Sequence, residues 1–288
     1  MPLATCSLPS ANGHIAGGPS PRFLMCPPAH FGVEYVINPW MNGQIHSTDD
    51  QLASRQWSQL HAILSRHAQV VSLAAVKGLP DLVFTANAAV VYRDVAVVSS
   101  FRYQERQPEA QHFADWLHAD GFDVHFLPPG VLFEGAGDAL FDRGLPLLWF
   151  GHGFRSGASA QPSLEKLIGV EVQPLELCDS RFYHLDTCFC PLEGGYLVYF
   201  PQAFTRSSNQ AIEARIPEQR RFAIPLDDAL HFTCNAVNIG TKVILNNASP
   251  QTLAWLAARG FDVVKTPMTE FMRSGGSAKC LSLRLDEA

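Results

Sequence analysis

Apolar and polar positions recur along the chain with two distinct periods. Short runs rich in valine, leucine and phenylalanine predict strands, and segments with an apolar residue every three or four positions predict helices. From about Arg22 onward the predicted order is strand, strand, helix, strand, repeated along the chain. The pattern predicts helices at about residues 48–67, 108–120, 163–169, 207–215 and 250–260.

A single polar residue interrupts the first strand of each repeat at nearly the same phase. The positions, separated by 45 to 51 residues, are Asn38, Asn87, Asp138, Asp186, Asn235 and Cys280. Burying one such group without a partner costs about 1–3 kcal/mol, so several at matched positions indicate one shared polar centre. The pattern therefore predicts an α/β propeller, with modules around a pseudo-symmetry axis and the site on that axis. An α+β domain with units of similar length by coincidence stays open.

The N-terminal stretch differs in composition from the rest. Residues 1–21 are rich in glycine, proline, serine and alanine and have no apolar periodicity, which predicts a mobile tail. The remainder, residues 22–288, is long enough to bury a large core and is expected to form a single catalytic domain.

Charge and composition exclude several classes of protein. A net charge of −6 argues against a nucleic-acid partner, which needs a basic face. No apolar run reaches the roughly 18 residues of a membrane span, and no secretory signal is evident. Seven cysteines without a regular framework favour reduced thiols. A cytoplasmic protein without a membrane partner is expected, and a homo-oligomer stays open.

Cys280 is the first candidate for chemistry. Gly275 and Gly276 precede it, and Leu281, Leu283 and Leu285 alternate with polar residues, so Cys280 is expected where a flexible turn enters a strand. The positive charge of the neighbouring Lys279 favours the thiolate, so a nucleophile is predicted. A buried core cysteine is the alternative, because free cysteines are among the most buried residues.

The segment His184-Leu-Asp186-Thr-Cys188-Phe-Cys190 places four side chains on one face if it is a strand. His184 can serve a thiol as general base, and Asp186 can hold a substrate. A metal site is disfavoured, because side chains about 6–7 Å apart along a line cannot surround one ion. For Cys188 and Cys190, an ordinary core position is expected.

Further polar groups suit a cationic ligand. Glu134 and Asp138 flank two glycines, although a plain acidic turn is the alternative. The amide of Asn87 can bind an amidino or ureido group. Arg106 and Arg155 can each pair with a carboxylate in a bidentate fork, unless they are solvated surface residues. Together the groups suggest a cationic substrate with a planar electrophilic carbon.

These motifs resemble the guanidine-modifying (amidinotransferase, or pentein) superfamily, and within it the arginine dihydrolase family. The resemblance covers about residues 22–284. It is carried by Met25–Met41, Pro80–Ala88, Phe133–Leu140, Gly153–Ser156, Phe182–Leu192 and Gly275–Arg284. It implies a fold of five ββαβ modules. Some bacterial relatives carry an additional ornithine-handling domain, an activity not expected here.

The resemblance also implies roles for single residues. Cys280 is the implied nucleophile, His184 the general acid and base, and Glu134 a partner of the guanidinium that assists proton transfer. Asp186 also contacts the guanidinium. The amino-acid end of the substrate is assigned to Asn38, Arg106 and Arg155, while Asp138 supports the site.

The implied reaction converts L-arginine to L-ornithine, two ammonia and CO2 without a metal or cofactor. Asn87 stands where arginine deiminases and dimethylarginine hydrolases have an aspartate, and the amide marks the two-step enzymes. A deiminase or dimethylarginine hydrolase that stops at citrulline stays open, as does a non-catalytic guanidine-binding protein.

Overall fold

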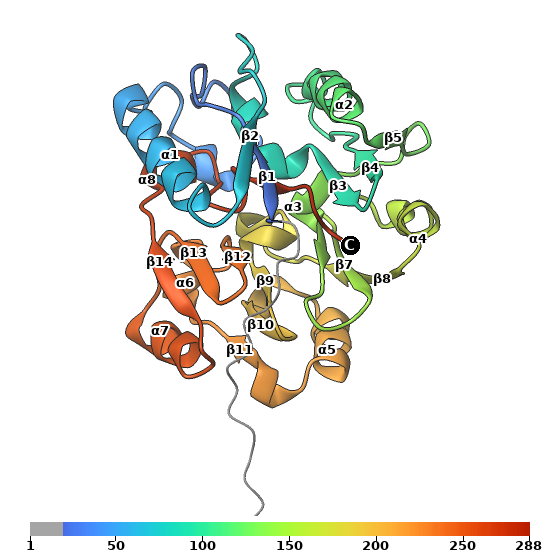
Figure 1. The fold of residues 1–288 in the computed structure, drawn as a ribbon, viewed down its shortest axis with the longest axis vertical. Helices are drawn as coiled ribbons and strands as arrows, with labels where there is room; N and C mark the ends of the chain where they lie inside the picture. Colours follow the sequence, from blue (N-terminus) through green and yellow to red (C-terminus); the bar gives the residue numbers. More distant parts are fainter. Residues whose placement is uncertain (1–19) are drawn as a thin grey trace, which may run out of the picture.

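Five three-stranded sheets surround a central axis in the computed structural model, which describes residues 20–288 (Figure 1). The prediction of an α/β propeller is therefore confirmed. Most of the predicted N-terminal tail, residues 1–19, lies outside the described residues.

Each sheet has the same topology. The inner strand pairs antiparallel with the middle strand, which pairs parallel with the outer strand. From inner to outer, and in order around the ring, the sheets are β15 (Leu283–Arg284), β1 (Arg22–Met25) and β2 (Gln69–Ser72); β3 (Ala89–Tyr92), β4 (Val95–Val98) and β5 (Asp123–Phe126); β6 (Ala139–Phe141), β7 (Leu147–His152) and β8 (Glu171–Glu176); β9 (Phe189–Leu192), β10 (Tyr196–Tyr199) and β11 (Arg221–Ala223); and β12 (Val237–Ile239), β13 (Lys242–Leu245) and β14 (Asp262–Lys265).

One longer helix in each module lies on the outside of the ring (Figure 1). Parallel strands need such a crossover connection, and each helix joins a middle strand to its outer strand. These helices, all predicted from the sequence, are α1 (Asp50–Leu64), α2 (Glu109–Ala119), α4 (Gln161–Ile168), α5 (Arg206–Arg215) and α7 (Pro250–Ala257). Three short helices were not predicted: α3 (Gly135–Asp138), α6 (Leu226–Leu230) and α8 (Thr269–Met272).

Helix α1 shows how the local sequence sets an element. The Asp49 side chain accepts a hydrogen bond from Leu52 N at 2.9 Å and caps the first turn. Leu60 and Leu64, four residues apart, are fully buried on the face that packs into the core. Most polar residues of α1 face solvent, while Gln56 is buried and bonds to Thr269 and Glu270.

Aromatic pairs join neighbouring sheets. Tyr92 of β3 stacks on Phe141 of β6 with ring centroids 5.0 Å apart. Trp149 of β7 meets Phe189 of β9 at 5.2 Å. Such contacts are worth about 0.5–1.5 kcal/mol beyond the burial of their area, and they fix the spacing of the modules around the axis.

The first sheet draws its strands from both ends of the described chain. Phe23 and Leu24 of β1 pair with Arg284 and Leu283 of β15. The strand that follows Cys280 thus completes the module that begins at Arg22, and this pairing closes the ring.

The repeating polar residues lie in short turns that precede the inner strands, so their predicted placement within strands was wrong. Asn87 ends the helical turn η3 (Thr85–Asn87), and Asp186 lies in the similar turn η6 (Leu185–Thr187). A turn bonds its own backbone, as Asn87 N does to Phe84 O at 3.0 Å, and it needs no neighbouring strand at the crowded axis. The prediction that these residues occupy matching positions in successive modules was correct.

Asn38 does not share that position, although the sequence repeat included it. It precedes the turn η1 (Pro39–Met41), and its side-chain oxygen accepts hydrogen bonds from Trp40 N and Met41 N. The inner position of the first module belongs to Cys280 instead, because β15 is the inner strand of that sheet.

The described part of the chain, residues 20–288, contains no helix with the length and apolar character needed to cross a membrane. Its six cysteines are all free, and only Cys178 is exposed.

Candidate active site

Cys280 lies in a buried turn beside two polar groups from other modules. Its thiol donates to Asp186 Oδ2 at 3.4 Å, and its sulfur accepts a hydrogen bond from Asn235 Nδ2 at 3.1 Å. Only 3% of the residue is exposed, so Cys280 is buried, as the alternative interpretation of a core cysteine expected, while it also contacts polar groups. The predicted convergence of the repeating polar positions is confirmed for these three residues.

Burial, and next the Asp186 charge, raise the pKa of the Cys280 thiol well above its usual value. The hydrogen bond from Asn235 and the charge of Lys279 act in the opposite direction but do not outweigh burial. The sequence correctly predicted that Lys279 lowers the pKa of Cys280. This effect is smaller than the increase caused by burial. A cationic substrate close to the sulfur would add the missing stabilisation of the thiolate.

His184 and Glu134 form a buried pair behind the cavity. His184 Nε2 lies 2.8 Å from Glu134 Oε2, and the two residues are 1% and 0% exposed. Burial alone would raise the pKa of Glu134, but the Arg155 charge and the bond to His184 hold that pKa below its usual range. Glu134 is therefore a carboxylate at neutral pH, able to accept a hydrogen bond from the imidazole and orient it.

Arg155 is also buried, which excludes the solvated surface position left open by the sequence. It donates to Glu134 Oε2 at 2.9 Å and to Ile37 O at 3.1 Å. Its guanidinium lies over the rings of Tyr103 and Tyr183, with centroid distances of 4.8 and 4.5 Å. These contacts hold the cation in one orientation at the cavity wall.

Arg106 fixes the amide of Asn87. The guanidinium pairs with the buried Glu109, and its Nη1 donates to Asn87 Oδ1 at 2.8 Å. Because a guanidinium only donates, the accepting atom of Asn87 must be its oxygen. Asn87 Nδ2 then has no partner within the described residues 20–288 and is a buried free donor.

Two predicted residues have mainly structural contacts here. Asn38 donates to Ser274 O at 3.0 Å and lies on the cavity wall. Asp138 accepts from Ser156 Oγ at 2.6 Å and from Leu185 N at 3.0 Å, and it does not line the cavity. Asp138 therefore fixes the segment that carries His184, as the supporting role implied.

A narrow cavity is lined by several of these groups. Five predicted residues line it: Asn38, Asn87, Arg106, Arg155 and Cys280. Asp81, Tyr183 and Ser274 lie on the same wall. Two of the predicted residues, His184 and Glu134, lie behind this lining and reach it through Arg155.

The prediction that His184, Asp186, Cys188 and Cys190 share one strand face was wrong. His184 precedes η6 and Asp186 lies within it, and of the four residues only Cys190 belongs to β9. The turn separates their partners, since His184 contacts Glu134 while Asp186 contacts Cys280. Within residues 20–288, no three histidine, cysteine or acidic side chains could hold a metal ion.

Gly137 allows Asn87 and His184 to lie side by side. A Cβ atom at Gly137 would lie 2.3 Å from Asn87 Nδ2 and 3.3 Å from the His184 ring. Gly137→Ala should therefore displace the Asn87 amide and lower the free energy of unfolding by about 1–3 kcal/mol, measured by urea denaturation.

The matched control for that substitution is Gly157→Ala. A Cβ there would meet Ser159 Oγ at 3.5 Å, an ordinary contact, so its stability should stay within about 0.5 kcal/mol of the unmutated value. Equal stability of the two variants would contradict the close approach at Gly137.

Sequence reasoning missed several contributing side chains. Asn235 was counted in the repeat but given no role, although its Nδ2 donates a hydrogen bond to the sulfur. Its matched phase was the available signal. No sequence signal marked Tyr183, Asp81 or Glu109, because these residues matter through their burial against Arg106 and Arg155.

Comparison with known proteins places the chain in a family. No family model matches. The bifunctional arginine dihydrolase/ornithine cyclodeaminase AgrE of Nostoc sp. is 51% identical over 266 residues, covering 92% of this chain but 38% of AgrE. The N(G),N(G)-dimethylarginine dimethylaminohydrolase of Mycobacterium tuberculosis is 37% identical, covering 92% of this chain and 85% of that enzyme.

A solved structure agrees with this placement over nearly its whole length. The N-terminal domain of ArgZ, described as an arginine dihydrolase from cyanobacteria and bound to substrate, has a TM-score of 0.92 at 49% identity. The match covers 93% of this chain and 98% of that domain. The chain thus spans well under half of the bifunctional relatives, yet it belongs to the arginine dihydrolase family of the guanidine-modifying superfamily.

Proposed function

We propose that the chain is an arginine dihydrolase, a C–N hydrolase that converts L-arginine to L-ornithine, two ammonia and CO2. The observation that supports this best is the free Asn87 Nδ2 on the wall of the cavity that holds Cys280. A two-step enzyme must bind citrulline, whose neutral ureido oxygen needs a donor, and this atom provides one.

The first step consumes the guanidinium. Asp186, with one oxygen bonded to the thiol and the other unpartnered, lies where it can receive the cation. Cys280 attacks the guanidino carbon as a thiolate, and His184 donates a proton to the departing ammonia. Water that gives a proton to His184 then hydrolyses the S-alkylthiouronium, which releases the thiolate and forms citrulline.

The second step repeats the attack on citrulline. Cys280 adds to the ureido carbon, and a second ammonia departs with a proton from His184. Water hydrolyses the remaining S-alkylthiocarbamate, which releases the thiolate and a carbamate of ornithine. Loss of CO2 from this carbamate breaks its C–N bond and leaves ornithine. The ureido carbon is a poor electrophile, and the donor Asn87 Nδ2 offsets charge that develops on its oxygen.

The walls of the cavity suit the amino-acid end of the substrate. Arg106 and Arg155 bring positive charge for the carboxylate, Asp81 brings an acceptor for the α-amino group, and Asn38 lies on the same wall. We also propose that residues 22–288 work as one catalytic domain on this small molecule, in the cytoplasm and without a cofactor.

Product analysis tests the proposal directly. The chain is incubated with L-arginine alone, and ornithine, citrulline and ammonia are quantified over time. Two ammonia and one ornithine per arginine are expected. One ammonia with stable citrulline would instead identify a deiminase, and methylamines released from dimethylarginine would identify the other alternative. If no product forms, the chain would be a non-catalytic guanidine-binding protein.

Asn87→Asp should change the product. An aspartate accepts from Arg106 with one oxygen and turns a carboxylate oxygen, rather than an N–H, toward the site. Conversion of citrulline should fall about 10-fold to 100-fold, as expected for loss of a charge-stabilising donor, so citrulline accumulates from arginine. Chromatography of the products measures this ratio.

The control for added charge is Asn247→Asp, at an exposed position, which should produce only ornithine. If Asn87→Asp also yields ornithine and no citrulline, the proposed role of the amide donor is wrong.

A further inference from the structure

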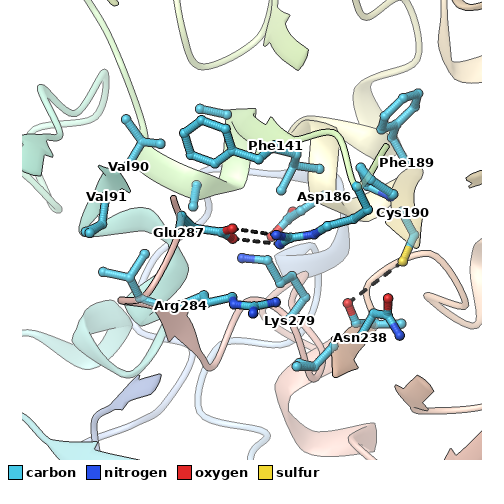
Figure 2. A pocket seen from close by; sticks show the side chains of 18 of the residues that line it. Val90, Val91, Phe141, Asp186, Phe189, Cys190, Asn238, Lys279, Arg284 and Glu287 are labelled. Atoms are coloured by element: carbon cyan, nitrogen blue, oxygen red, sulfur yellow. Dashed lines mark hydrogen bonds and ion pairs between the residues drawn. The ribbon is translucent and has the colours of Figure 1, made fainter. Parts of the chain in front are cut away.

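A second cavity occupies the axis of the ring, and Asp186 and Lys279 are among its lining residues (Figure 2), whereas Cys280 lines the first cavity. The inner strands of all five sheets line it, so its walls are largely apolar. Val90, Val91, Phe141 and Phe189 are among these walls, and the proposed reaction uses none of them.

An ion pair lies at one end of this axial cavity. Arg143 Nη1 and Nη2 bond to the two carboxylate oxygens of Glu287 at 2.5 and 2.6 Å. Arg143, Phe141 and Glu287 also line a separate, more open cavity, so this pair lies between the axial cavity and solvent. Arg143 and Glu287 neutralise each other, so neither has a free charge to bind a ligand.

Other charged groups of the axial cavity lack partners. The Lys279 ammonium makes no hydrogen bond or ion pair with any residue from 20 to 288. Arg284 bonds to Asp286 through Nε and Nη2, but its Nη1 is buried without a partner. Figure 2 shows Lys279 between the Glu287 carboxylate and Arg284. Two cationic groups without partners among residues 20–288, Lys279 Nζ and Arg284 Nη1, thus lie beside the apolar wall of the axial cavity.

We propose that the axial cavity is a binding site for a short-chain monocarboxylate. The carboxylate would pair with Lys279 and Arg284, and its aliphatic tail would lie against Val91 and Phe141. Buried charges are stable when paired and hydrogen-bonded, which such an anion achieves for both donors at once. The neighbouring Asp186 does not oppose it strongly, since burial raises the pKa of that carboxyl to about 7.

The site is coupled to Cys280 through Lys279. The positive charge of Lys279 lowers the pKa of both Asp186 and Cys280 against the larger effect of burial. A bound carboxylate offsets this charge, so it should make the Cys280 thiolate rarer and slow its alkylation. By linkage, loss of the thiolate should favour carboxylate binding in return.

Isothermal titration of the unmutated protein with butyrate, at constant ionic strength, tests the proposal. Saturable binding is expected for butyrate and not for butyramide, which has a similar tail without the charge. Lys279→Met should weaken butyrate binding about 10-fold or more. Removing an unpaired buried charge should not unfold the chain, and Arg284→Met provides a second variant with the same expectation.

Two controls locate the ligand. Lys242→Met, in a surface ion pair with Asp262, should leave the affinity unchanged. Arg155→Met alters the wall of the Cys280 cavity and should also leave it unchanged. The proposal is overturned if butyrate does not bind, if butyramide binds equally, or if Lys279→Met has no effect. Loss of binding only in Arg155→Met would place the ligand in the other cavity and also overturn it.

A separate observation concerns Asn235, whose side chain uses all its hydrogen-bonding capacity. Its Oδ1 accepts from Ser277 N at 3.2 Å and from Cys280 N at 3.1 Å. Its Nδ2 donates to Asp186 O and to Cys280 Sγ, both at 3.1 Å. Two backbone N–H groups can only donate, so the atom that faces the sulfur is necessarily the amide nitrogen.

The geometry points to Asn235 as a positioning residue that holds the Cys280 turn and directs an N–H toward the sulfur. An N–H donor favours the thiolate over the thiol. The other titratable groups near this sulfur are Asp186, Lys279 and Tyr183. Tyr183 donates to Gly275 O, whereas Asn235 accepts from the N–H groups of Ser277 and Cys280. Asn235 therefore links the conformation of the turn to the reactivity of the thiol.

The pH profile of Cys280 alkylation by iodoacetamide tests this role. Asn235→Asp keeps an acceptor for the two backbone groups but places an oxygen against the sulfur, so alkylation at pH 8 should slow about 10-fold or more. Asn235→Ala, which adds no charge, should shift the profile in the same direction. Asn238→Asp is the control, because that similarly bonded amide does not contact the sulfur. A loss of thermal stability with an unchanged profile in both Asn235 variants would overturn the proposal.

Discussion

Cys280→Ser should abolish ammonia release from L-arginine, with a decrease of about 10³-fold or more in turnover. The serine hydroxyl has almost the same shape but remains protonated, because neither the Asn235 donor nor Lys279 can stabilise an alkoxide at neutral pH. Arginine should still bind, since the Asn87, Arg106 and Arg155 walls stay in place. Ammonia assays and calorimetry with arginine measure the two effects separately.

Cys178→Ser is the matched control, because that thiol is exposed and far from the cavity lining, and it should be fully active. A Cys280→Ser variant that binds arginine and releases ammonia at the unmutated rate would exclude Cys280 as the nucleophile.

Glu134→Gln should have the second large effect, on stability and on activity together. The amide keeps the volume but removes the one carboxylate that, among residues 20–288, bonds to the buried Arg155 and His184. Leaving a buried cation uncompensated typically costs about 3–5 kcal/mol, although the two tyrosine rings and Ile37 O retain part of the stabilisation of Arg155. Urea unfolding measures the loss, and arginine turnover should fall about 100-fold or more.

The effect of pH gives a second check on Glu134. Its lowered pKa in the folded protein means that its stabilisation is complete above the ordinary glutamate pKa of about 4.3 and is lost as the pH falls toward the lowered value. The difference in unfolding free energy between the unmutated protein and Glu134→Gln should therefore shrink in strong acid. Glu165→Gln, on the exposed face of α4, should show no difference at any pH. Unchanged stability of Glu134→Gln at pH 7 would contradict the buried ion pair.

The repeating elements could be predicted because each module has its own local signals. Helix α1 has a capping aspartate and apolar residues at helical spacing, and the hairpin from β9 to β10 turns at Gly194 and Gly195, both with positive φ. The number of modules was harder to obtain from spacing alone. Asn38 entered the count as a sixth polar position because nothing local distinguishes its capping role from the axial positions.

The candidate site was predictable where its residues share the phase of the repeat. Asn87, Asp186 and Cys280 were found in this way. The contacts that set their chemistry were not, because they depend on burial across modules. Arg106 looks like a loop arginine until Glu109 and Asn87 are seen to enclose it. The same limit applies to Cys280, whose sequence neighbour Lys279 indicated a low pKa while the enclosing fold raises it.

The pairing of β1 with β15 also sets an order of events during synthesis. Phe23 emerges from the ribosome early but pairs with Arg284, so its sheet stays incomplete until almost all described residues are made. Closing such a long loop is slow compared with forming a local hairpin. Cys280 follows Asp186 and Asn235 in the chain. Its turn can pack against them only when β15 is about to pair with β1. A nascent chain would thus carry no assembled thiol centre, and its reactivity would begin with closure of the ring.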